Sequence, residues 1–357
     1  MVSRLKVVID LFDLAAELVD IPSESHDETA LADYFEKRLR AASYLDTERI
    51  GDNLVARTQL GCKHRLIIAG HLDTVPANGN QGARIEGDRL YGLGACDMKG
   101  GLAAQLASAL SIEKPKIDVT YVFYAGEEVA AEYNGLNQLY VMRPDLLEGD
   151  TALLGEPTSA QIEAGCQGTL RARFTYHGKR AHTARPWKGI NAIHRLGHVL
   201  SRLDRFEGRR PVIDGCEYRE AIQSVFVEGG VAGNVVPDRA LLTVNLRYAP
   251  DRSPDEAEKY LLEQVGDYDE VVITDHSVAA APDLKHPIIN TLINDNELMV
   301  KAKLGWTDVA RFAEHGIPAS NFGPGDASIA HTKDEFVERQ EIEQVYNALQ
   351  NLLTSET

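Results

Sequence analysis

The chain has 357 residues, of which 44% are apolar and 25% are charged, and its formal net charge is -17. This composition is typical of a soluble globular protein, and the length exceeds what one hydrophobic core usually supports, so we expect two domains. The acidic balance argues against nucleic acid and anionic membrane surfaces as partners, because both attract basic surfaces. No run of about 18 uncharged apolar residues occurs, so no membrane span is predicted.

The N-terminal residues and the cysteines both favour a cytoplasmic location. Residues 1–8 contain no apolar core of signal-peptide length before Asp10 and Asp13. The four cysteines are far apart and form no Cys-x-x-Cys pair, so we expect free thiols in a reducing compartment and no cysteine-based metal site. They are Cys62, Cys96, Cys166 and Cys216.

The first half of the chain alternates helical patterns with buried strands. Apolar residues recur at helical spacing over residues 11–21 and 31–39, with a loop between them. Apolar runs at residues 66–70, 119–125 and 152–155 predict strands, and the small residues 100–110 predict a helix that packs closely on a sheet. This alternation indicates an α/β sheet, in which ligands bind beyond the strand ends.

The pattern changes near Gly168. Strand, helix, strand, strand, helix and strand then follow, which is typical of a small α+β sandwich. The α/β pattern resumes after about residue 280 and ends with a helix near residues 341–353. We therefore predict a discontinuous catalytic domain of residues 1–167 and 280–357, interrupted by an inserted domain of residues 168–279.

Polar groups capable of chemistry follow the predicted strands. His71 and Asp73 lie two apart in an extended segment, so their side chains point to the same side, and Asp73 is placed to orient the imidazole. Asp97 lies in a glycine-dense loop before the small-residue helix and is placed to bridge two metal ions. That loop lacks the Gly-Lys-Ser/Thr ending of a phosphate-binding loop and does not fit Gly-x-Gly-x-x-Gly, which argues against nucleotide binding.

Three further acidic or imidazole groups complete the set. In Glu127-Glu128, one carboxylate suits a metal ligand and the other a general base, because adjacent carboxylates otherwise repel each other. Glu156 follows the third predicted strand, and His331 lies near a late turn. Each of these, taken alone, is also typical of a solvated surface group. Together they supply enough ligands for two metals that share a bridge.

The order His-x-Asp, Asp-Met-Lys-Gly, Glu-Glu, Gly-Glu-Pro and late His resembles the dinuclear zinc aminoacylase, desuccinylase and carboxypeptidase family over nearly the whole chain. The resemblance implies a mixed-sheet zinc-hydrolase domain with an inserted α+β lid and dimerisation domain. It implies two Zn²⁺ ions per subunit, with Co²⁺ as a substitute, and a cis peptide after Asp97. One ion would be held by His71, Asp97 and Glu156, the other by Asp97, Glu128 and His331. Glu127 would be the general base, and Asp73 would support His71.

The inserted domain also carries residues that match the family. His182, in Gly178-Lys-Arg-Ala-His-Thr, matches a histidine that reaches the partner subunit's site and stabilises the oxyanion, which implies a homodimer. Asn234 and Arg247 match residues that bind the acyl and carboxylate ends of the substrate, and Arg185 is a further candidate substrate ligand. His194 and His198, four apart on a predicted helix, are a weaker candidate metal pair because no carboxylate follows in register.

Residues 164–169, 181–195 and 231–238 are similar to the actinobacterial group of succinyl-diaminopimelate desuccinylases. This implies hydrolysis of a small N-acyl amino acid to succinate and LL-2,6-diaminopimelate, in lysine biosynthesis. Desuccinylases of the proteobacterial type have an arginine pair where this chain has Cys166-Gln167. Acetylornithine deacetylase, or another N-acyl-amino-acid amidohydrolase or metallopeptidase of the family, therefore stays open. A non-catalytic binding relative and a dinucleotide-dependent oxidoreductase are the alternatives from other classes.

Overall fold

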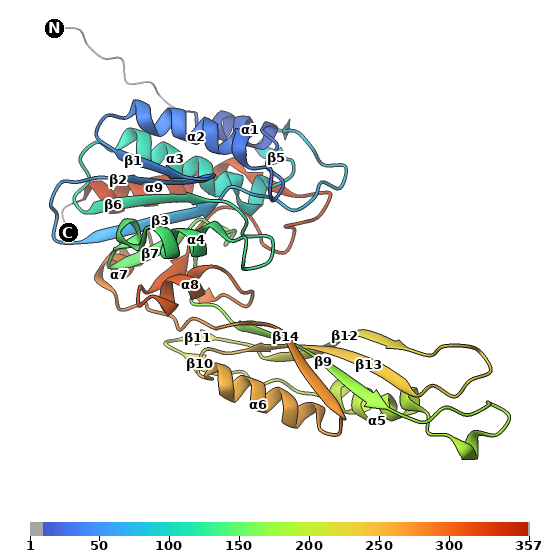
Figure 1. Cartoon of the computed structure of the whole chain (residues 1–357). Helices are drawn as coiled ribbons and strands as arrows, with labels where there is room; N and C mark the ends of the chain where they lie inside the picture. Colours follow the sequence, from blue (N-terminus) through green and yellow to red (C-terminus); the bar gives the residue numbers. More distant parts are fainter. Residues whose placement is uncertain (1–9, 356–357) are drawn as a thin grey trace, which may run out of the picture. The chain divides into compact units, whose positions relative to one another are not determined.

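The computed structural model describes residues 10–355, which form two compact units (Figure 1). Unit 1 comprises the described residues up to Ala164, Asp283–Lys301 and those from Arg311 onward, and unit 2 comprises Gly165–Pro282 and Ala302–Ala310. The signal-peptide prediction concerns residues 1–8 and lies outside the described residues. None of the described helices combines the length and the apolar character that a membrane crossing requires.

Unit 1 is built on an eight-stranded sheet in the order β1-β2-β6-β3-β7-β16-β8-β15, most of which is visible in Figure 1. β3, β6, β7 and β16 run parallel, whereas β1 pairs antiparallel with β2, β2 with β6, and β8 with β16. The sheet is therefore mixed, and the predicted α/β class is confirmed. The strands are β1 (Asp46–Ile50), β2 (Asn53–Arg57), β3 (Arg65–His71), β6 (Asp118–Tyr124), β7 (Thr151–Leu154), β8 (Ile162–Ala164), β15 (Val300–Ala302) and β16 (Ala319–Asn321).

The predicted helices over residues 11–21, 31–39, 100–110 and 341–353 are confirmed. α3 can pack closely on the strand ends because it begins with glycine: a Cβ atom on Gly101 would lie 2.2 Å from the backbone oxygen of Gly155. The helices are α1 (Leu11–Asp20), α2 (Thr29–Ala41), α3 (Gly100–Ser111), α4 (Gly135–Met142), α7 (Pro287–Asp295), α8 (Val309–Glu314) and α9 (Arg339–Thr354), with a short 3-10 turn, η2 (Pro144–Leu147).

The segment around Asp97 is more ordered than the glycine-dense loop that the sequence predicts. It forms a π-helical turn, η1 (Ala95–Lys99), which Gly94 enters with a φ of 76°, in the left-handed region that favours glycine. The Asp97–Met98 peptide is cis, as the family resemblance implies. Beside this turn lies a three-stranded sheet of β4 (Arg84–Glu86), β5 (Arg89–Tyr91) and β17 (Phe336–Glu338), which the sequence does not reveal.

Unit 2 is a four-stranded antiparallel sheet with two helices, in the predicted order of strand, helix, strand, strand, helix and strand. Its core lies between one sheet face and the helices and includes Phe174, Leu196 and Leu261. Its elements are β9 (Gly168–His177), α5 (Ala192–Asp204), β12 (Ala221–Gly229), β13 (Arg239–Tyr248), α6 (Pro254–Val265) and β14 (Glu270–Ser277), with the short elements η3 (Pro186–Lys188), β10 (Val212–Ile213) and β11 (Cys216–Glu217). β12 and β14 are the edge strands of the larger sheet.

Candidate metal centre

The parallel strands of unit 1 bring acidic and imidazole groups to one edge of the sheet. β3 pairs in parallel register with both β6 and β7, so the carboxyl ends of all three strands lie at the same edge. His71 is the last residue of β3, Glu127 and Glu128 follow β6, and Glu156 follows β7. Parallel α/β sheets bind ligands at this edge, beyond the strand ends.

Asp97 lies between two histidines that come from distant parts of the chain. Its Oδ1 is 3.2 Å from Nε2 of His71, and its Oδ2 is 3.4 Å from Nε2 of His331. The same His331 nitrogen is 2.8 Å from Oε1 of Glu128. The two oxygens of one carboxylate therefore face two different imidazoles, which is the arrangement that a carboxylate bridging two metal ions requires.

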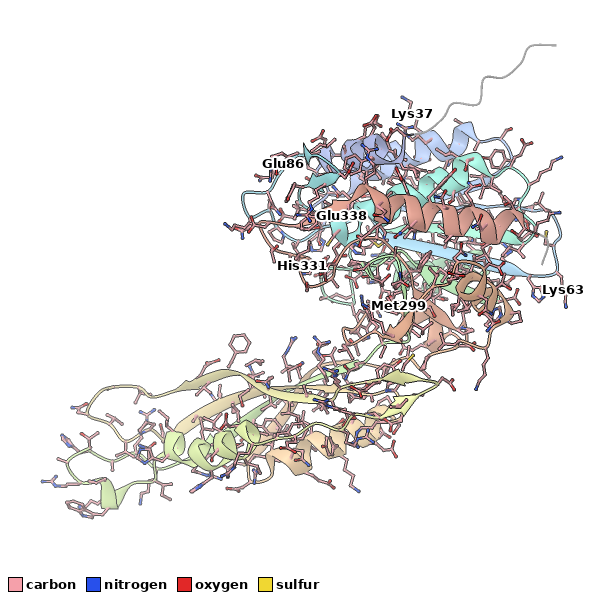
Figure 2. All side chains as sticks on the ribbon, turned by 180° about the vertical axis from the view of Figure 1, so that it is seen from behind. Lys37, Lys63, Glu86, Met299, His331 and Glu338 are labelled. Atoms are coloured by element: carbon pink, nitrogen blue, oxygen red, sulfur yellow. The ribbon has the colours of Figure 1, made fainter. Side chains whose placement is uncertain are left out.

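Among residues 10–355, three sets of side chains have potential ligand atoms within 4.8 Å of one another. The first set is His71, Asp97 and Glu156, and the second is Asp97, Glu128 and His331. The third set joins His71 to Glu127 and Glu128, so Glu127 lies beside the first two sets. His71 and Glu156 are buried, whereas His331 lies in an exposed loop (Figure 2).

Asp73 is buried and organises two neighbouring segments. Its Oδ1 accepts a hydrogen bond from the Glu127 backbone N–H at 2.9 Å, and its Oδ2 accepts one from the Glu128 N–H at 3.0 Å. Nδ1 of His71 is 3.0 Å from the Asp73 backbone oxygen and 3.5 Å from Oδ1. Asp73 thus orients the Glu127-Glu128 backbone in addition to His71, a role that the sequence does not indicate.

The ionisation of these groups reflects an excess of carboxylates. Burial acts to lower the pKa of His71, but hydrogen bonds with Asp73 and Asp97 outweigh it and raise that pKa well above its ordinary value. Hydrogen bonds with Asp97 and Glu128 raise the pKa of His331 to about 10. Burial acts to raise the pKa of Asp73, but its contacts with His71 and the backbone lower it to about 2. The carboxylates thus draw positive charge into the cluster, and a bound cation would supply that charge.

One buried carboxylate beside the centre is missing from the residues that the sequence singles out. Oε1 of Glu335 accepts hydrogen bonds from the backbone N–H groups of Cys96 and Asp97, at 3.0 and 3.1 Å. Its side chain is almost fully buried, and burial raises its pKa to about 7. Its place four residues after His331 is the only sequence signal, because burial and partner are invisible in a single sequence.

The other predicted site residues belong to unit 2. His182 forms an isolated bridge with Val235, and the Thr183 N–H donates to the Asn234 backbone oxygen at 3.0 Å, so the structure brings these two loops together. Arg185 follows in the same loop and is exposed. Arg247 lies near the C-terminal end of β13, whereas Asn234 precedes the start of that strand, so the structure does not place them side by side within unit 2.

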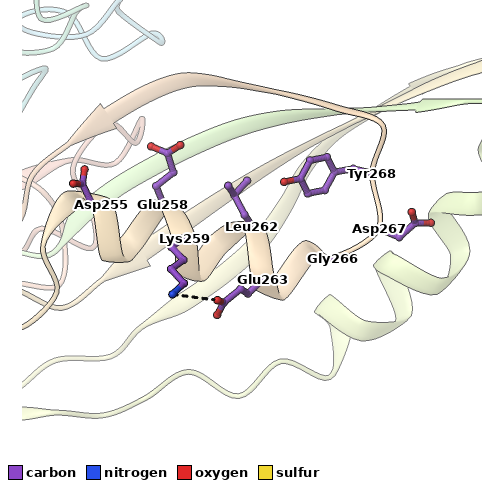
Figure 3. Close-up of a pocket in the computed structure, with 8 residues that line it drawn as sticks. All are labelled: Asp255, Glu258, Lys259, Leu262, Glu263, Gly266, Asp267 and Tyr268. Carbon is purple, nitrogen blue, oxygen red and sulfur yellow. Dashed lines mark ion pairs between the residues drawn. The ribbon is translucent and has the colours of Figure 1, made fainter.

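Two hollows in the described part of the chain are lined by none of the predicted site residues. A hollow in unit 2 lies along α6 near Tyr268, where Lys259 pairs with Glu263 at 3.9 Å (Figure 3). A second hollow lies in unit 1 beside Tyr140 and His315, whose rings stack. Within residues 10–355, no group of potential metal ligands includes His194 or His198.

Comparison with known proteins matches a family model to this chain. The model for peptidase family M20/M25/M40 matches residues 67–355. This span begins inside β3 and contains His71, the Asp97 turn, the Glu127-Glu128 segment, Glu156 and His331.

Relatives that match nearly the whole chain include proteins of Corynebacterium glutamicum and Mycobacterium tuberculosis. The succinyl-diaminopimelate desuccinylase of Corynebacterium glutamicum is 42% identical over 366 residues, covering 99% of each chain. A Mycobacterium tuberculosis protein, provisionally named succinyl-diaminopimelate desuccinylase, is 49% identical over 330 residues, covering 92% of this chain and 93% of its own length. The fold is also similar to that of the Bacillus subtilis YXEP protein, described as a dinuclear metal-binding peptidase of the M20 family. The two structures have a TM-score of 0.70 at 15% identity over 96% of each chain.

Proposed function

This chain belongs to peptidase family M20/M25/M40, and from that premise we propose that it is a metal-dependent amide hydrolase, a succinyl-diaminopimelate desuccinylase. It hydrolyses the amide bond of N-succinyl-LL-2,6-diaminopimelate and releases succinate and LL-2,6-diaminopimelate. The matches with named desuccinylases cover 92% and 99% of the chain. The observation that carries the hydrolytic chemistry is Asp97, whose two oxygens face His71 and His331.

The ligand set fits two zinc ions. His71, Asp97 and Glu156 would hold one ion, and Asp97, Glu128 and His331 the other. Imidazole nitrogen and carboxylate oxygen are ligands that zinc prefers, and Co²⁺ would substitute because it accepts the same ligands. When bound, such ions polarise a carbonyl group and lower the pKa of water. Asp97 and Glu128 have ligand atoms within 4.8 Å of both imidazoles, and Glu156 has one within 4.8 Å of His71. This convergence supports the assignment, because the carboxylates repel one another unless positive charge lies between them.

Glu127 is the proposed general base. Its carboxylate takes a proton from the attacking water, and it passes that proton to the amine nitrogen as the carbon–nitrogen bond breaks. Asp73 accepts hydrogen bonds from the backbone N–H groups of Glu127 and Glu128, so it fixes the backbone from which both side chains extend. In this pair, Glu128 is the proposed metal ligand and Glu127 is the proposed base.

Residues of unit 2 are proposed to bind the substrate. Arg247 is the strongest candidate, because its partly buried guanidinium makes no hydrogen bond or ion pair with any described residue. Burial, and secondly the nearby Arg171, lower its pKa, so it would gain from a carboxylate partner. Cys166 and Gln167, which stand where desuccinylases of the proteobacterial type have arginines, are both buried, and Gln167 donates to the Arg219 backbone oxygen. We assign supporting contacts with the substrate to Asn234 and Arg185.

We also propose that the enzyme is a homodimer formed through unit 2. β12 is an edge strand, and Val225, Phe226 and Val227 along it are exposed apolar residues. An exposed apolar edge strand offers unpaired backbone groups to a second copy of the chain. His182 of the partner subunit would then stabilise the oxyanion, as the family resemblance implies.

A cytoplasmic location completes the proposal. All four cysteines are free thiols, as the sequence predicts, and Cys96, Cys166 and Cys216 are buried. Chains with free cysteines are typical of reducing compartments.

The decisive test is a turnover assay of the zinc-loaded enzyme with N-succinyl-LL-diaminopimelate and with N-acetylornithine. We expect a preference for the succinyl substrate of about 100-fold in kcat/KM, equivalent to roughly 2.7 kcal/mol of transition-state discrimination. A preference for N-acetylornithine would keep the hydrolytic chemistry and make the protein an acetylornithine deacetylase. Hydrolysis of neither substrate, with both metals bound, would refute the proposal.

A further inference from the structure

Glu335 connects two chain segments that each carry a proposed metal ligand. One segment contains Asp97, which belongs to both proposed ligand sets, and the other contains the exposed His331. His331 lies four residues before Glu335, and the Glu335 carboxylate contacts the turn that contains Asp97. The two segments also meet through their backbones. The Gly92 N–H donates to the backbone oxygen of Glu335 at 3.3 Å, and β17 pairs with β5. Glu335 is thus the side chain at the junction of two ligand-bearing segments.

The turn that carries Asp97 needs such a partner. Asp97 and Met98 have non-helical backbone angles inside η1, and the first N–H groups of any helical turn have no acceptor within it. Oε1 of Glu335 accepts from two consecutive N–H groups, those of Cys96 and Asp97. Only 1% of Glu335 is exposed, so water does not compete for these donors.

The loop that carries His331 needs an anchor as well. His331 has a φ of 63°, in the left-handed region that residues other than glycine rarely adopt. The loop is exposed around His331 and becomes buried at Glu335. Such a conformation persists only where the surrounding contacts hold it.

We propose that Glu335 is a positioning residue that holds the Asp97 turn and the His331 loop in register and so sets the affinity of the metal pair. This inference rests on the proposed metal centre. The hydrogen-bond acceptor at the Oε1 position produces the effect, and the negative charge of the carboxylate does not. The ion held by Asp97, Glu128 and His331 depends on it most, because two of its three ligands lie on the connected segments.

The test separates geometry from charge with a pair of substitutions. Glu335→Gln keeps an oxygen acceptor at the same distance along the side chain and removes the charge. Glu335→Asp keeps the charge and withdraws the oxygens by one methylene. We expect Glu335→Gln to bind metal within about threefold of the unsubstituted chain, and Glu335→Asp to lose at least about tenfold in affinity for the weaker-bound ion.

The readout is metal binding itself, measured by chelator competition with Zn²⁺ and by the visible absorption of bound Co²⁺, which reports ligand geometry. Glu220→Gln and Glu220→Asp form the matched control, because Oε1 of the buried Glu220 also accepts a backbone N–H, that of Ala249, at 3.3 Å, in unit 2 and outside both ligand segments. We expect the Glu220 pair to leave metal affinity unchanged.

Three outcomes would overturn the inference: full affinity in Glu335→Asp, equal losses in both Glu335 variants, or an equal loss in Glu220→Asp. The first would show that the position of the oxygens does not matter, the second that the negative charge is needed as well, and the third that loss of any buried carboxylate contact suffices. A chain that binds no metal pair before substitution would instead defeat the proposed metal centre, so the two failures are distinguishable.

Discussion

Glu127 is a residue whose proposed role can be separated from metal binding. Its backbone is held by Asp73, and it is absent from the two ligand sets that share Asp97. We expect Glu127→Gln to lower kcat by a factor of about 10²–10⁴, the usual contribution of a general base, and to leave two metals bound. Turnover and metal content are measured on the same preparation. Loss of a metal together with activity would show that Glu127 is a ligand.

Arg247 is expected to determine affinity for the substrate carboxylate. Replacing it by Met removes a charge-assisted hydrogen bond worth about 1.5–3 kcal/mol, so kcat/KM for the succinyl substrate should fall about 10–150-fold. Arg171→Met is the matched control, because this neighbouring arginine lies 3.8 Å from Asp275 and has a partner already. Equal losses in both variants would mean that the general positive charge of this sheet face is what matters.

The close contact of helix α3 with the strand ends can be tested directly. A Cβ atom on Gly101 would collide with the backbone oxygen of Gly155, which cannot move without shifting the segment before Glu156. We expect Gly101→Ala to lower the free energy of unfolding by about 1–3 kcal/mol, the usual cost of overpacking.

Gly197, within α5, is the contrasting position. It is exposed, and a Cβ atom there would meet nothing within 4 Å. Gly197→Ala should therefore raise the free energy of unfolding by about 0.5–1 kcal/mol, because alanine favours the helix. Denaturant unfolding of both variants checks the pair. A stabilised Gly101→Ala variant would show that the contact is looser than the structure has it.

The elements that the sequence predicts are those whose pattern is set by burial along one segment. β3 and β6 are buried at nearly every residue, so they appear as continuous apolar runs, and α3 appears as a run of small residues. The family resemblance, confirmed by the family match, supplied the roles of the strand-end residues. The pairing of β17 with β5 and the contact of Glu335 with the Asp97 turn were missed, because each joins segments more than 200 residues apart.

In the proposed dimer, the two edge strands of the unit 2 sheet have different roles: β12 contacts the second copy and β14 does not. Phe226, on β12, has 65% of its surface exposed, and Val272, on the other edge strand β14, has 51% exposed. We expect Phe226→Asp to shift the protein to monomers and to lower activity, because His182 would no longer reach a partner. Light scattering and turnover measure the two effects, and Val272→Asp should change neither. A monomeric chain before substitution, with full activity, would rule out the proposed role of His182.

The net charge of -17 sets the last expectation, since it repels an anionic substrate at long range. N-succinyl-diaminopimelate carries three carboxylates and one ammonium group near pH 7, whereas N-acetylornithine carries one of each. Added salt screens the repulsion, because the Debye length falls from about 30 Å at 0.01 M to about 8 Å at 0.15 M ionic strength. The kcat/KM of the succinyl substrate should therefore rise with salt over this range, on the order of twofold, and that of N-acetylornithine should change less. A fall in kcat/KM for the succinyl substrate would mean that local arginines, Arg247 foremost, dominate the field that the substrate meets, so that the approach to the site is attractive in an otherwise acidic protein.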